Sequence, residues 1–97
     1  MSNTIANTIA QQIGNAALSM IGARDLVATE SGLQLAIGRN PKGVSKLVVD
    51  LAADDTYTVS AYKGRGLTIR LVGSTEMVYA DSLRATIEQV TGLLTTL

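Results

Sequence analysis

The chain has 97 residues, enough for one domain that buries a single hydrophobic core. It contains no cysteine and no histidine, which excludes disulfides, thiolate zinc sites and cysteine nucleophiles and removes the commonest general base and metal ligand. Eight basic and eight acidic residues cancel, and this balance argues against a dedicated electrostatic binder of nucleic acids or membranes.

Residues 3–21 have the apolar spacing of an amphipathic helix. Isoleucines recur every four positions, as at Ile5 and Ile9, and smaller apolar residues continue the stripe. Gly14 inside this segment costs about 1 kcal/mol relative to alanine, so we expect the helix to depend on packing. Gly22 suits the left-handed residue that ends many helices. The opposite face carries only uncharged amides, which leaves two interpretations open, a solvated face or an interaction surface.

Five short segments follow in which apolar and polar residues alternate, the pattern of strands with one buried face. They cover residues 24–30, 33–37, 46–51, 57–62 and 67–72. The connections are short and carry glycine, proline or aspartate, residues that favour tight turns. Short connections join antiparallel neighbours, so the simplest topology is a meander.

The alternation sorts these residues into two sheet faces. The face expected to form the core carries Leu33, Leu35, Ile37, Leu47, Val49, Leu51, Tyr57, Val59, Ala61, Leu67, Ile69 and Leu71. The more polar face is expected to carry Gln34, Ala36, Lys46, Val48, Asp50, Thr58, Ser60, Tyr62, Thr68, Arg70 and Val72. Residues 79–91 predict a second amphipathic helix, and two helices can cover the apolar face. We therefore predict that residues 1–97 form a single α+β domain with two layers, α-β5-α, in which N- and C-terminal helices pack on one face of an antiparallel meander sheet.

Residues suited to catalysis are scarce. Without histidine and cysteine, acid–base chemistry falls to carboxylates, lysine or tyrosine. The one carboxylate pair, Asp54-Asp55, lies in an expected turn, where such residues usually cap or solvate the backbone. No further ligand completes an oxygen cage for a divalent cation. We therefore expect no enzyme activity, no catalytic or metal-binding residue and no cofactor.

The polar sheet face and the turn beside it offer a candidate interaction surface. Its six residues are Lys46, Val48, Tyr62, Lys63, Arg65 and Arg70. A tyrosine with apolar and basic neighbours is typical of a protein contact. The same tyrosine could stack a nucleic-acid base, although sheets that read RNA usually present two or three aromatics. The Lys63–Gly66 turn carries two cations, and it is either an ordinary hairpin turn or an anion contact.

Six stretches within residues 9–97 carry a family resemblance. They are Ile13-Gly14-Asn15, Met20-Ile21-Gly22-Ala23-Arg24, Asp55-Thr56-Tyr57, Arg65-Gly66, Val78-Tyr79-Ala80-Asp81-Ser82-Leu83-Arg84 and Thr91-Gly92-Leu93-Leu94-Thr95-Thr96-Leu97, of which the last two are the most specific. On these stretches the chain resembles an uncharacterised family of small proteins of phages, prophages and mobile elements. Family members often have an aromatic residue where this chain has Leu26 and a tyrosine where it has Leu94. The resemblance implies a phage-like origin and a bacterial cytoplasmic setting, and no site residue carries over.

We therefore expect a non-enzymatic binding protein, an accessory factor of a phage or mobile element that binds and modulates a host or phage protein. Inhibition of a host system fits the small size. The alternative is a small nucleic-acid-binding module that uses the polar sheet face and the Lys63–Gly66 turn, and a small-ligand binder between sheet and helices ranks below both.

Two further expectations concern the surface and the location of the protein. Charged residues make up only 16% of the chain. Either small uncharged residues, or a partner or second copy that covers part of the surface, would explain this fraction, so a homodimer stays an open alternative. The N-terminus has no basic segment followed by an apolar run, so we expect no membrane association and a cytoplasmic location.

Overall fold

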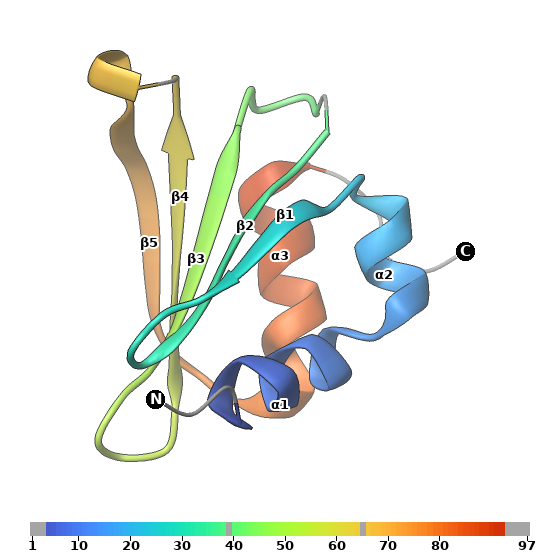
Figure 1. Ribbon diagram of the computed structural model, residues 1–97, viewed down its shortest axis with the longest axis vertical. Coiled ribbons are helices and arrows are strands. Elements are labelled where there is room, and N and C mark those ends of the chain that lie inside the picture. Colours follow the sequence, from blue (N-terminus) through green and yellow to red (C-terminus); the bar gives the residue numbers. More distant parts are fainter. Residues whose placement is uncertain (1–3, 39, 65, 93–97) are drawn as a thin grey trace.

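The computed structural model describes residues 4–38, 40–64 and 66–92. They form a five-stranded sheet with helices on one of its faces, so the expected two-layer α+β architecture is confirmed (Figure 1). The strands lie in the order β1-β2-β3-β4-β5 and every neighbouring pair is antiparallel, which is the predicted meander. None of the helices within these ranges is long and apolar enough to span a membrane.

The three central strands supply most of the sheet's contribution to the core. They are β2 (Gly32–Ala36), β3 (Lys46–Leu51) and β4 (Tyr57–Lys63), and they pair with one another without a register shift. Their inward side chains alternate with half-buried outward ones, and Leu35, Leu47 and Val59 are completely buried. Each large apolar side chain removed from water in this way stabilises the fold by about 1.5–3 kcal/mol.

The last strand differs from its prediction. The sequence predicts a strand over residues 67–72 with a loop after it, whereas β5 spans Arg70–Val78. The residues before it, Gly66–Thr68, form a short 3-10 helix, η1, in which Leu67 is fully exposed. The alternation predicts that Leu71 lies in the core, but this side chain is 54% exposed. An edge strand with little buried surface needs no continuous apolar stripe, so hydrophobic alternation locates it poorly.

A glycine divides the N-terminal helix in two. α1 (Thr4–Ile13) and α2 (Asn15–Met20) replace the single helix predicted over residues 3–21, because Gly14 between them has φ 90° and ψ 147°. Only glycine adopts such a conformation without strain. The isoleucine stripe still packs against the sheet, with Ile9 completely buried, so the predicted apolar face is right although the helix is broken.

The C-terminal helix packs against β4 and β5. After the short 3-10 helix η2 (Ala80–Ser82), α3 (Leu83–Thr91) places Leu83 and Ile87 in the core, where both are completely buried. The helix ends at Gly92, whose φ of 74° is the left-handed conformation of a common C-terminal cap. The predicted second helix is therefore present. The first edge strand, β1 (Arg24–Ala28), lies at the other side of the sheet.

Candidate interaction surface

A row of paired residues crosses the sheet face that the described helices leave open. Successive cross-strand partners from β1 to β5 are Arg24, Ala36, Lys46, Tyr62 and Leu71. Directly opposite residues of an antiparallel pair share a face, with Cβ atoms about 4.5–5.5 Å apart. These five side chains therefore form a continuous strip, which we call the outer row.

Two of the predicted site residues interact within the outer row. The Lys46 ammonium lies 5.1 Å from the centroid of the Tyr62 ring, a cation–π contact between half-buried side chains. Val48 lies two residues after Lys46 in β3, so it shares that face, where it is flanked by Gln34 and Ser60. The fold thus brings Lys46, Val48 and Tyr62 together as expected.

The remaining predicted residues do not join them. Lys63 follows Tyr62 in β4 and so points to the opposite face, and its cross-strand partner there is Arg70. The assignment of Arg70 to the face of Tyr62 is therefore wrong. The sixth predicted residue, Arg65, lies outside the described residues.

A β-bulge is the physical reason for this rearrangement. Ala61 pairs with Gly73 and Tyr62 with Leu71, so β5 has one extra residue, Val72, at this point. An extra residue reverses the faces of the side chains that follow. Leu71, expected in the core, therefore extends the outer row, and Val72, expected on the polar face, lines a cavity beside α3. Gly73 inside the strand was the available signal, since glycines often mark bulges.

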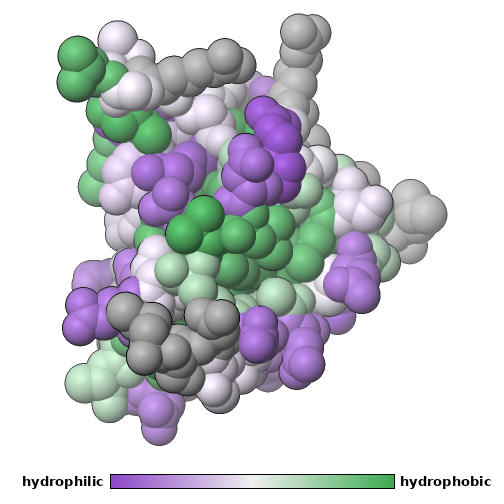
Figure 2. Space-filling model, in the orientation of Figure 1, coloured by the Kyte–Doolittle hydropathy of each residue, from purple (hydrophilic) through white to green (hydrophobic). Residues whose placement is uncertain are grey.

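Hydrophobic surface continues along the edge strand β1. Leu26 and Val27 are 44% and 50% exposed, and Val27 is the cross-strand partner of Gln34 on the outer face. Figure 2 shows hydrophobic surface gathered over β1 and bordered by hydrophilic side chains. An exposed apolar patch with a polar rim is typical of a contact surface.

The charges divide between the two ends of the sheet. Of the six basic residues that the structure describes, five lie at the end where β1, β3 and β5 begin: Arg24, Lys42, Lys46, Lys63 and Arg70. Six of the eight acidic residues lie toward the opposite end: Glu30, Asp50, Asp54, Asp55, Glu76 and Asp81. The neutral net charge therefore conceals a dipole along the strands, and attraction for an anion is concentrated at one end, which we call the basic end.

Side-chain hydrogen bonds order the connections at the basic end. Asn40 donates to the carbonyls of Gly38 and Val44 over 2.9 and 2.6 Å, and its own carbonyl oxygen accepts the Val44 N–H over 2.9 Å. The Ser45 hydroxyl lies 2.9 Å from the Gly64 carbonyl oxygen and so ties the β2–β3 connection to the end of β4. A binding surface held in this way loses less conformational entropy when a partner arrives.

The carboxylate pair singled out by the sequence serves a turn. Asp54 Oδ1 accepts hydrogen bonds from the hydroxyl of Thr56 over 2.6 Å and from its backbone N–H over 3.2 Å. These bonds lower the pKa of Asp54 below its ordinary value, because they favour the ionised form. Asp55 follows in the left-handed conformation, with φ 67°. Within the described ranges, no three acidic side chains gather as a metal site would require.

A hollow of about 550 Å³ adjoins the outer row at the basic end, and Arg24, Ala36 and Lys46 line part of it. No family model matches the chain, and neither a curated protein nor a solved structure does. The candidate site is therefore defined by geometry alone. It combines an open sheet face, a cation–π pair, the exposed apolar side chains of Leu71, Leu26 and Val27, and a hollow with cationic walls.

Proposed function

We propose that this chain is a non-enzymatic binding protein, an accessory factor of a phage or mobile element that modulates a host or phage protein. The outer row carries this proposal. Burial of its apolar members against a partner, above all Tyr62 and Leu71, would stabilise a complex. Arg24 and Lys46 flank them with positive charge. Contact surfaces between proteins are enriched in aromatic and arginine side chains around such a centre.

The chemistry of the outer row also indicates the kind of partner. The cationic hollow beside it would receive a carboxylate, while Tyr62, Val48 and Leu71 would pack against apolar side chains. We therefore propose a partner protein whose binding surface has an apolar centre and an acidic rim. Complementary charge of this kind mainly raises the association rate, and the buried aromatic contact mainly slows dissociation.

The test compares a tyrosine in the outer row with one outside it. Wild type, Tyr62→Ala and Tyr79→Ala are immobilised and exposed to an extract of the bacterial host, and retained proteins are quantified. Tyr79 is 59% exposed but lies after β5, outside the outer row, so it is the matched control. We expect a partner that wild type and Tyr79→Ala retain equally and that Tyr62→Ala binds at least about tenfold more weakly, as loss of an anchor residue would cause.

Two measurements make this comparison decisive. Circular dichroism and thermal unfolding establish that Tyr62→Ala is folded, since Tyr62 is half-buried. Lys46→Glu should then reduce the association rate of the same partner, and the reduction should shrink as salt screens the charge. Equal retention by wild type and a folded Tyr62→Ala variant would exclude the outer row as the interface.

The basic end favours a second candidate, a nucleic-acid-binding module. Five described cations lie there, and Tyr62 could stack a base beside Lys46. This candidate predicts binding of a labelled single-stranded oligonucleotide that weakens steeply with salt, because phosphate contacts release counterions. Lys63→Gln and Arg70→Gln should each weaken that binding as much as Lys46→Gln does. Absence of binding at low salt would remove this candidate and leave the protein partner.

A further inference from the structure

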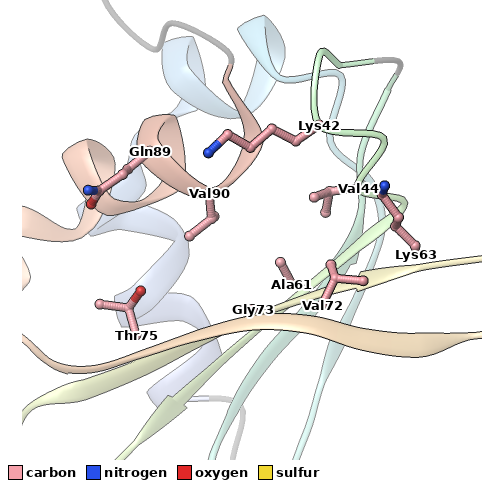
Figure 3. A pocket seen from close by; sticks show the side chains of 9 residues that line it. All are labelled: Lys42, Val44, Ala61, Lys63, Val72, Gly73, Thr75, Gln89 and Val90. Carbon is pink, nitrogen blue, oxygen red and sulfur yellow. The ribbon is translucent and has the colours of Figure 1, made fainter.

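A cavity of about 530 Å³ lies between α3, the end of β4 and the first half of β5, on the face opposite the outer row. Figure 3 shows its floor at Ala61 and Gly73 and one wall at Val90 of α3. Its volume falls within the range of about 300–1,000 Å³ typical of small-molecule sites. The helix therefore leaves part of the inner face uncovered.

Two small residues and a bulge create this space. Ala61 and Gly73 are direct cross-strand partners, so the floor has one methyl group where a pair of large side chains would fill the core. A Cβ atom built on Gly73 meets no atom within 4 Å. The bulge then directs Val72 into the lining. The cavity thus has an apolar floor whose open space results from the sequence at two positions.

The mouth of the cavity is cationic. Lys42 extends across it from the β2–β3 connection toward α3, and Lys63 rises from the end of β4 (Figure 3). The glycine at position 43 leaves space for the Lys63 side chain, because a Cβ atom on residue 43 would lie 3.1 Å from the Cε atom of Lys63. None of the nine described residues that line the cavity is acidic, and Thr75 and Gln89 add hydrogen-bonding groups.

We propose that this cavity binds a small organic anion with a compact apolar body, such as an aromatic or branched carboxylate. The apolar body would cover Ala61, Gly73 and Val90, and the anionic group would lie between the ammonium groups of Lys42 and Lys63. Charge complementarity fixes the class of ligand, because both cations line the space and none of the described residues around it is acidic. This site is independent of the outer row, since the two lie on opposite faces of the sheet.

The anion requirement is tested with two dyes that share one aromatic skeleton. Anilinonaphthalene sulfonate carries a negative charge, and N-phenylnaphthylamine is neutral. We expect saturable binding of one sulfonate dye per chain, at least tenfold tighter than binding of the neutral dye. Lys42→Met combined with Lys63→Met should remove this preference, whereas Lys46→Met on the outer face should leave it unchanged. An equal affinity for both dyes in wild type, or a preference that survives the double substitution, would overturn the proposal.

The location is tested by filling the cavity. Gly73→Leu places a side chain into the open space and should weaken both dyes at least tenfold, while Ser74→Leu adds the same side chain on the other face and should change neither affinity. If Gly73→Leu does not fold, Thr75→Phe fills the cavity from the next inward position. Unchanged dye binding in a folded, filled variant would refute the site. Tyr62→Ala should keep dye binding intact, so this proposal and the proposed protein contact fail separately.

Discussion

Two hairpins of this protein share β4 and differ in regularity. β3 and β4 pair over six consecutive residues without a shift, and both lie inside the sheet. β4 and β5 pair with two register shifts, and β5 is an edge strand whose residues are mostly exposed. In the β3–β4 hairpin the hydrophobic alternation predicts correctly which face each side chain occupies. In the β4–β5 hairpin a bulge changes the faces, so the alternation predicts them wrongly.

The difference shows what fixes the register of a strand. A slip by one residue in β3 would move Leu47 and Val49 from the core to solvent, so burial enforces the observed pairing. In β5 Val78 is buried and the other residues are exposed or half-buried, so a slip there exposes little apolar surface. Irregular pairing is therefore tolerated in β5, and its outward side chains, such as Leu71, are free to contact a partner.

The largest expected difference between the two hairpins is the loss of stability when one leucine in each is replaced by alanine. Leu47→Ala removes a completely buried side chain of β3 and should lower the free energy of unfolding by about 2–5 kcal/mol. Leu71→Ala removes a side chain of β5 that is 54% exposed and should change the stability by no more than about 0.5 kcal/mol. Urea unfolding of both variants measures the difference. A similar loss in both would mean that β5 is packed as firmly as β3.

The first hairpin was predictable because its signals agree. The strand of residues 46–51 has the predicted bounds, and the alternation places Leu47 and Val49 correctly. Two other features were not predictable from hydrophobicity. The break at Gly14 depends on a backbone conformation that leaves the apolar stripe unchanged, and the exposure of Leu67 depends on where the chain turns into β5.

A second comparison concerns two residues in the left-handed conformation. Asp55 in the β3–β4 turn has φ 67°, and Met77 near the end of β5 has φ 58°. Aspartate tolerates this region, but a long apolar side chain is strained there. Met77→Gly should therefore stabilise the fold by about 0.5–1 kcal/mol, more than Asp55→Gly does. Met77 is 60% exposed, so little packing is lost. Thermal unfolding measures both variants. A lower unfolding temperature for Met77→Gly than for Asp55→Gly would contradict the claim that Met77 is strained.

The residues of the candidate site also differ in how well the sequence predicts their positions, according to the hairpin to which they belong. Lys46 and Tyr62 could be placed together from the sequence, because both belong to the regular hairpin and become direct partners there. The relation of Lys63 and Arg70 to them could not, because it depends on the bulge between β4 and β5. A bulge leaves no mark in a hydrophobicity pattern. Gly73 signals its position in the sequence, but the backbone pairing is needed to assign each cation to a face.

The smallest expected effect concerns the turn of the regular hairpin and its response to acid. The hydroxyl and then the backbone N–H of Thr56 lower the pKa of Asp54 in the folded protein, so the unfolded state binds its proton more readily. This contribution to stability is complete above the unfolded pKa of about 4 and is lost as the pH falls through the lower folded value. Thr56→Val removes the hydroxyl donor, so the variant should lose less stability than wild type between about pH 7 and about pH 3.

The matched control is Thr58→Val, the same chemical change two residues along β4 and away from Asp54. Its unfolding temperature should fall with acid as steeply as that of wild type, because the pair of bonds to Asp54 is intact. Parallel acid profiles for all three proteins would show that the turn does not depend on these bonds. The β3–β4 hairpin would then owe its regularity to strand burial alone, and the contrast with β4–β5 would reduce to the difference between an interior and an edge strand.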